Sequence, residues 1–353
     1  MPIIDQGYQH WSGQLSSHAW RWLAITRRGL KTALQGRFVR MALLMAWSPA
    51  LLLAVVLCLW GLVERQSELV ETFKPALTGL LGRPVLTGPR DYRVDIWTLS
   101  FHYFLTCELW FAMLLILLVG PNLISQDLRY NALPLYFSRP LRRIDYFLGK
   151  LGVIVALLGM IIVAPAIVAY LLGLLFSLDI TILRDTLPIL LGSVVYGLVI
   201  SISAGLLILA FSSISRNSRY VSLMWIGFCL IATIVSTVLT EVDRHQRMHE
   251  MGAQFRNWSN AAFLAGEMEA AKTNWRPVIS YISNLRRIEE ALLHTNASWA
   301  RLGELSGGQR EPIVMQMLYS QFPWYWSAAV LLLLAALSAW ILTLNIKSLD
   351  RLK

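Results

Sequence analysis

A single acidic side chain stands near the middle of a long apolar segment. Glu108 lies in the stretch 97–124, and the only other residue of that stretch that titrates near neutral pH is His102. A carboxylate surrounded by hydrocarbon is costly unless it is protonated, paired or hydrated. Glu108 therefore either borders a substrate pathway or makes a structural hydrogen bond to another helix, unless the apolar segment is drawn wrongly. His102, six residues earlier, lies on a different part of the helix surface.

A second pair of residues has the spacing of metal ligands. His245 and His249 are four positions apart, on one face of an expected helix, with several carboxylates nearby. Helices of zinc metalloproteases place two histidines at this spacing and a glutamate base directly after the first one. Gln246 occupies that position here, so we expect no metal site.

These residues belong to a chain that is built from apolar segments. The composition is 56% hydrophobic with 14 tryptophans among 353 residues, which is far from that of a soluble domain. Six stretches approach or exceed the roughly 20 apolar residues that cross a bilayer as a helix. We expect an all-α, polytopic membrane protein with spans at 41–62, 97–124, 151–175, 187–211, 221–239 and 325–344.

The charges are divided unevenly between the two sides that these spans define. The side that carries both termini holds sixteen of the 31 basic residues but only four of the 21 acidic residues. Basic residues favour the cytoplasmic side of short loops, so we expect both termini in the cytoplasm and the chain in the cell (inner or plasma) membrane. Because the cations flank membrane spans instead of lining one face, we expect lipid phosphates and a cytoplasmic protein as partners, and no nucleic acid.

The connections divide the chain into four parts. Residues 1–40 form a cytoplasmic segment in which 16–40 reads as an amphipathic interfacial helix, and 41–240 holds the first five spans with a cytoplasmic loop at 121–150. Residues 241–324 are expected to form an extracytoplasmic helical domain, with helices near 261–272 and 277–294. The sixth span and a cytoplasmic C-terminus occupy 325–353.

One short motif is misleading. Residues 305–309 read Leu-Ser-Gly-Gly-Gln, which is the signature sequence of ATP-binding-cassette ATPases. Such an ATPase also needs a Gly-x-x-x-x-Gly-Lys loop for the phosphates, and the sequence has none. The charge distribution also places Ser306 outside the cytoplasm. We interpret the motif as a coincidence.

The loop 121–150 is the most specific segment of the chain. Pro121 can loosen the end of the second span, while Pro134 and Pro140 bound a short aromatic and apolar element. Tyr136 and Phe137 would lie at the membrane surface beside several arginines. This arrangement predicts a compact knob that faces the cytoplasm.

This loop resembles the one between spans two and three of type-2 ATP-binding-cassette permeases, the membrane subunits of exporters. The likeness rests on 125–129 and 135–140, on Arg143, Tyr146 and the pair Gly149 and Lys150, and on the layout of six spans. It implies a permease that dimerises with an identical or different chain and exports its substrate between the two copies. It also implies that ATP and Mg²⁺ are bound by a separate cytoplasmic ATPase, and no cofactor by this chain. The ATPase would contact Tyr136, Phe137, Arg139 and Arg143, while Glu108 and His102 would be candidates for the substrate pathway.

Three other readings remain open at this point. In the first, the arginines of the loop only keep it on the cytoplasmic side and contact lipid head groups, without binding an ATPase. The chain can be a non-transporting scaffold, or an intramembrane transferase, although the sequence shows no paired carboxylates at one membrane level. A secondary transporter would show inverted repeats, which the sequence lacks. The segment 241–324 is longer than the re-entrant helices that many such permeases carry, so the cargo is not implied.

Overall fold

The computed structural model describes residues 20–65, 88–133, 136, 142–177, 180–254, 273–305 and 322–350, and within these ranges the chain is helical without a strand. The first half of the described chain forms α1 (Arg21–Gln35), α2 (Arg37–Glu64), α5 (Arg93–Arg129), α7 (Arg143–Leu158), the π-helical turn η2 (Gly159–Val163) and α8 (Ala164–Ser177). The second half forms α9 (Ile180–Ile214), α10 (Ser218–Gln254), the 3₁₀ turn η3 (Arg276–Ile279), α12 (Tyr281–Leu293), α13 (Thr295–Leu305) and α15 (Trp324–Asp350).

Six helical segments of the described chain are long and apolar enough to cross a membrane, which confirms the expected number of spans. They are Arg37–Glu64, Arg93–Arg129, Arg143–Ser177, Thr181–Ile214, Ser218–Gln246 and Trp324–Asn345. The third span is the continuous run of α7, η2 and α8. The helices extend beyond the predicted apolar stretches, most of all α10, which continues to Gln254 instead of ending near residue 239. The side on which each terminus lies stays a prediction.

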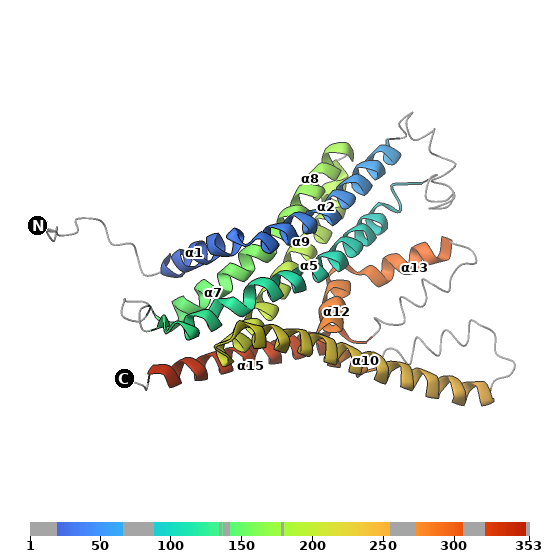
Figure 1. Ribbon diagram of the computed structural model, residues 1–353. Coiled ribbons are helices and arrows are strands. Elements are labelled where there is room, and N and C mark those ends of the chain that lie inside the picture. The colour runs from blue at the N-terminus through green and yellow to red at the C-terminus, as the bar shows by residue number, and fades with distance from the viewer. Residues whose placement is uncertain are drawn as a thin grey trace, which may run out of the picture.

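The N-terminal helix differs from the expected single helix over 16–40. α1 ends at Gln35, Gly36 is extended (φ −64°, ψ 124°), and α2 begins at Arg37. One residue in this extended conformation is enough to separate the two helices. α1 then lies along α7 (Figure 1), and Gly149 and Gly152 allow the two backbones to approach closely. Residues 1–19 lie outside the described part of the chain.

The centre of the bundle is the pair α5 and α9. Arg93 lies near Thr181 at one end, and Ser125 lies near Ser212 at the other, so the two helices run in the same direction. Apolar side chains of both helices are fully buried, including Leu105, Leu109, Ala112, Ile200, Ala204 and Ile208. Gly120 permits a close approach to Ile208. This pair is therefore the scaffold against which the other spans pack.

α12 does not stand apart from the six spans. It packs against α5, α9, α10 and α15 and occupies the space between them in Figure 1. At its first residue, the Tyr281 hydroxyl lies 2.9 Å from Ser203 Oγ, well inside α9, and the Tyr281 ring contacts Trp225 and Phe228 of α10. α12 consequently lies within the depth that the spans define. The structure confirms helix over most of 277–294, while the expected helix at 261–272 lies outside the described residues, and the extracytoplasmic location of 241–324 stays a prediction.

Candidate functional site

A compact polar cluster joins the end of α5 to the start of α7. Asp127 Oδ2 accepts a hydrogen bond from the Tyr146 hydroxyl at 2.7 Å and lies 2.6 Å from Lys150 Nζ. Tyr146 is fully buried, while the side chains of Lys150 and Asp127 keep only 11% and 16% of their exposure. A charged hydrogen bond and an ion pair on one carboxylate oxygen fix α7 relative to α5. We call these three residues the Asp127 cluster.

Tyr136 of the predicted docking loop rests on the Asp127 cluster. Its ring centroid is 5.3 Å from that of Tyr146, and Lys150 Nζ lies 5.9 Å from its centre. Such contacts attract a cation to the ring face. Burial, and secondly the Asp127 carboxylate, raises the pKa of the Tyr136 hydroxyl above its ordinary value. Tyr136 is thus held as a half-buried neutral side chain at the end of the bundle.

The other predicted docking residues are only partly covered by the structure. Arg143 is the first residue of α7 and is exposed, one position after the N-cap residue Arg142, whose backbone N–H donates to Asp145 Oδ2 at 3.1 Å. Phe137 and Arg139 lie outside the described residues. The Asp127 cluster was not predictable as a unit from the sequence, because Tyr146 and Lys150 lie 19 and 23 positions after Asp127. The available signal was the presence of one acidic residue near the start of a strongly basic loop.

α1 is attached to the same turn of α7. The Thr26 hydroxyl donates to the Gly149 carbonyl at 3.0 Å. Gly149 lies in the sequence between the cluster residues Tyr146 and Lys150. A Cβ atom at Gly149 would lie 2.6 Å from Ile25 Cβ, and one at Gly152 would lie 2.5 Å from Thr26 Oγ1. The helices therefore touch through their backbones. Any displacement of this turn of α7 must also move α1.

A serine of α9 enters the backbone hydrogen-bond ladder of α5 beside Pro121. Ser212 Oγ donates to the Pro121 carbonyl at 3.0 Å and accepts from the backbone N–H groups of Ile124 and Ser125 at 3.1 and 2.9 Å. A hydroxyl that enters a helix in this way gives hydrogen-bond partners to backbone groups in the turn after a proline. α5 consequently continues through Pro121 to Arg129 instead of ending there. The sequence predicted a weakened helix near Pro121, and the Ser212 hydroxyl of α9 fills this part of α5.

Glu108 faces the bundle interior, as expected for a carboxyl group in an apolar segment. The residue is 0% exposed, and neither carboxyl oxygen has a hydrogen-bond partner among the described residues. An unpaired carboxylate at this depth would cost several kcal/mol, so the group is uncharged. The structural alternative of a hydrogen bond to another helix is not realised within the described part of the chain.

His102 is not a partner of Glu108 but contacts α12. Its Nδ1 atom lies 2.8 Å from Glu289 Oε1, and Glu289 is 0% exposed. With Glu289 ionised, Nδ1 carries the proton and donates. Sequence reasoning missed this pair, because the two residues are 187 positions apart and no spacing rule joins them. The two candidate pathway residues are thus separated, one unpaired and one tied to α12.

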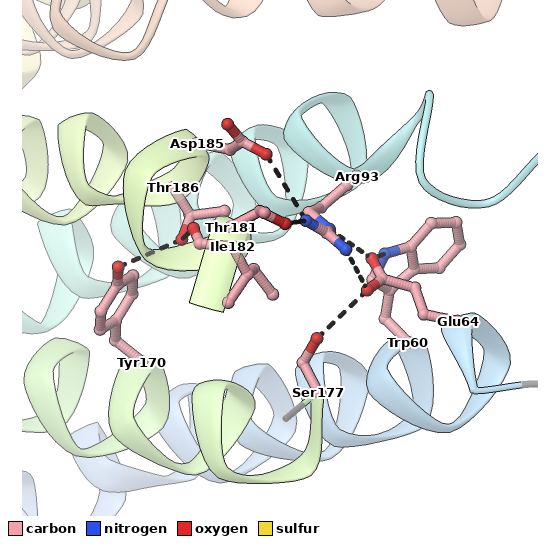
Figure 2. A network of polar contacts seen from close by, with 9 residues as sticks. All are labelled: Trp60, Glu64, Arg93, Tyr170, Ser177, Thr181, Ile182, Asp185 and Thr186. Atoms are coloured by element: carbon pink, nitrogen blue, oxygen red, sulfur yellow. Dashed lines mark hydrogen bonds and ion pairs between the residues drawn. The ribbon is translucent and has the colours of Figure 1, made fainter. Parts of the chain in front are cut away.

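A second buried ion pair closes the other end of the bundle. Arg93 donates from Nε and Nη2 to the two oxygens of Glu64, each at 2.8 Å, and both side chains are almost fully buried. Ser177 and Trp60 also donate to Glu64, while Thr181 and Asp185 accept from Arg93 (Figure 2). This network ties α2, α5, α8 and α9 together. The sequence suggested only loop charges here.

The structure covers the remaining sequence motifs only in part. His245 and His249 lie on α10, and the described residues contain no group of three potential metal ligands. Ser306 and the rest of the Leu-Ser-Gly-Gly-Gln motif after Leu305 lie outside the described residues. No protein-family model matches the chain, and no curated protein matches it either.

Proposed function

We propose that the chain is the membrane-spanning permease subunit of an ATP-driven exporter. In this proposal two such chains form the substrate pathway, and a separate cytoplasmic ATPase docks on the loop between the second and third spans. ATP and Mg²⁺ belong to that ATPase. The observation that carries the proposal is the attachment of Tyr136 to the Asp127 cluster, because it joins a residue of the predicted docking loop to the second and third spans.

The cluster gives this loop a route for transmitting force. A push on Tyr136 acts on Tyr146 and Lys150, which belong to the third span, and on Asp127, which ends the second span. The Thr26 hydrogen bond extends the same body to α1. A flexible loop would absorb a displacement, whereas a packed polar cluster has few alternative arrangements and passes it on.

The second span then carries the displacement to the centre of the bundle. Ser212 joins α5 to α9 near Pro121, and Ser125 Oγ lies 2.9 Å from Ser218 Oγ at the start of α10. Docking at the loop would therefore bias the positions of α5, α9 and α10 together. Glu108 lies further along α5, within reach of such a movement.

Co-purification tests the proposal directly. The full-length chain is isolated in mild detergent from its own host, and the accompanying soluble proteins are assayed for ATPase activity. We expect an ATPase with the wild type and its loss from Tyr136→Ala/Phe137→Ala/Arg139→Ala. The matched control is Arg216→Ala/Arg219→Ala, which removes two exposed cations at the turn from α9 into α10 and should retain the ATPase. Absence of an ATPase from the wild type would favour the scaffold reading.

A further inference from the structure

The bundle covers one face of the amphipathic helix α1 and leaves the opposite face open. Thr26 is buried against Gly149 of α7, and Leu30 and Ala33 pack on the core of the bundle. A Cβ atom at Gly29 would lie 2.6 Å from a methyl carbon of Val153, so this side of α1 has no room for a ligand. The apolar side of α1 is therefore covered by protein, and the surroundings of the protein meet its other side.

The open face of α1 is cationic. Arg27, Arg28 and Lys31 are exposed, and no described residue forms a hydrogen bond or ion pair with their charged groups. Residues 20–63 contain six basic residues and no acidic one. Arg27 and Lys31 are four positions apart, so their like charges repel each other when α1 is helical. A negatively charged partner from outside the chain would relieve this repulsion.

Exposed apolar side chains share this face with the cations. Trp20 is 65% and Leu23 44% exposed, and they precede Arg27 by seven and four positions, which places all three on one side of the helix. Lys31 lies six residues, or about 9 Å of helix, before Arg37, where the first membrane-spanning segment begins. Cations beside an exposed tryptophan and leucine suit the boundary between head groups and acyl chains. This combination favours a membrane surface over an acidic soluble partner.

We propose that α1 binds anionic lipid head groups through Arg27, Arg28 and Lys31, and that this binding stabilises the turn of α7 on which α1 rests. Guanidinium groups bind phosphate oxygens through paired hydrogen bonds, and the lysine adds a point charge. Helical α1 gathers the three charges on one face, whereas an unfolded segment spreads them. Anionic lipid therefore binds the helical form more tightly and stabilises it.

The contact between α1 and α7 carries this effect to the Asp127 cluster. The Thr26 hydroxyl donates to the Gly149 carbonyl at 3.0 Å, and Lys150, the next residue, lies 2.6 Å from the Asp127 carboxylate. A ligand that holds α1 in place also holds this turn of α7 in place, because the two are linked. That ATPase docking responds to lipid charge rests on the proposed function, whereas the binding of head groups does not.

Lipid binding is tested on the purified full-length chain in a nonionic detergent. Phosphatidylglycerol and phosphatidylcholine with equal acyl chains are titrated, and retained lipid is counted by native mass spectrometry. We expect wild type to bind phosphatidylglycerol about tenfold more tightly, because several cations contribute. Arg27→Gln/Lys31→Gln should lose most of this preference, and Arg27→Lys/Lys31→Arg, which exchanges the two cations, should keep it. The matched control Arg216→Gln/Arg219→Gln removes two exposed cations at the same end of the bundle and should also keep it.

The stabilising effect is tested in nanodiscs of phosphatidylcholine with and without phosphatidylglycerol. Hydrogen exchange of the α1 backbone amides should be several-fold slower with phosphatidylglycerol in wild type, and equal in both lipids in Arg27→Gln/Lys31→Gln. Retention of the ATPase is scored separately in the same nanodiscs. Wild type should retain more ATPase with phosphatidylglycerol, and Arg27→Gln/Lys31→Gln should retain the same amount in both.

Four results decide against parts of the inference. An unchanged preference in Arg27→Gln/Lys31→Gln, or an equal loss in Arg216→Gln/Arg219→Gln, would overturn the lipid site. Displacement of phosphatidylglycerol by soluble glycerol phosphate would assign this face to a soluble anion. Equal exchange of α1 in both lipids would overturn the stabilising role. A wild type that binds and responds to phosphatidylglycerol but carries no ATPase would contradict the proposed function and support the lipid site.

Discussion

His102 of the second span and Glu289 of α12 are 187 positions apart in the chain, and their side chains meet at 2.8 Å between Nδ1 and Oε1. This contact fixes α12 within the bundle, because Glu289 is fully buried and His102 keeps only 11% of its side-chain exposure. Without its partner, either residue would leave a buried polar group unpaired.

Glu289→Leu should therefore destabilise the protein by about 1 to 3 kcal/mol, the usual cost of an unpaired buried group. Unfolding in detergent, followed by circular dichroism, measures the loss. The double variant His102→Leu/Glu289→Leu should recover most of it, because both polar groups are then absent. Glu241→Gln is the control, since its carboxylate is 42% exposed and lies 3.8 Å from Arg244. A Glu289→Leu variant as stable as wild type would contradict the structural role of the pair.

The Asp127 cluster predicts strong coupling between two charges. Asp127→Asn should lower the free energy of unfolding by about 2 to 4 kcal/mol. The loss lies toward the lower end of that for buried ion pairs, because both side chains keep some exposure. It leaves the Lys150 ammonium largely buried without its counter-charge. A double-mutant cycle with Lys150→Met measures the interaction, and the double variant should be more stable than Asp127→Asn alone. Additive losses would mean that the two charges do not interact.

The contact between α1 and α7 predicts that Gly149 tolerates no side chain. Gly149→Ala should lower the free energy of unfolding by about 1 to 3 kcal/mol, which is the usual effect of overpacking. The added Cβ would lie 2.6 Å from Ile25 Cβ. Gly159→Ala is the matched control in the same span, since a Cβ atom there meets nothing within 4 Å. Thermal unfolding in detergent compares the two. Equal effects of the two substitutions would show that α1 does not pack closely on α7.

We expect the protein to tolerate the substitution of Glu108 by glutamine. Because its carboxyl group is uncharged, Glu108→Gln keeps both the shape and the charge of the side chain, and stability should change by less than about 0.5 kcal/mol. A hydrophobic carbodiimide, which reacts with protonated buried carboxyl groups, should modify wild type but not the variant, as read by peptide mass spectrometry. A large destabilisation in Glu108→Gln would instead indicate an ionised carboxylate with a partner.

The same variant informs the substrate pathway. If Glu108 contacts the cargo of the proposed exporter, Glu108→Gln should reduce transport while the folded protein stays intact. Retained transport would favour a purely structural position in the bundle.

The membrane spans were predictable from the sequence because their signal is local. About twenty apolar residues in succession have few alternatives to a spanning helix, and all six predicted stretches fall within helices of the structure. The interior orientation of Glu108 was also predictable, because a carboxyl group that faces hydrocarbon is costly. The break at Gly36 was not predictable, since the residues on both sides of it continue an amphipathic pattern.

The location of α12 could not be derived from local pattern. Its thirteen residues include Arg286, Arg287, Glu289 and Glu290, which is the composition of a helix exposed to water. The structure nevertheless places it among the spans through contacts of very distant residues, such as Tyr281 with Ser203. The Asp127 cluster likewise depends on how the chain turns between α5 and α7. Such pairings have no spacing rule in the sequence.

The hydrogen bond between Thr26 and Gly149 spans 123 positions, and this distance has a consequence for biosynthesis. α1 leaves the ribosome before its own binding surface on α7 has been synthesised. Until the third span is complete, the apolar side of α1 must be sheltered elsewhere, by lipid or by a chaperone. Assembly of this part of the chain therefore follows insertion of the spans: α1 is synthesised before α7 but reaches its final position only after α7 is in place.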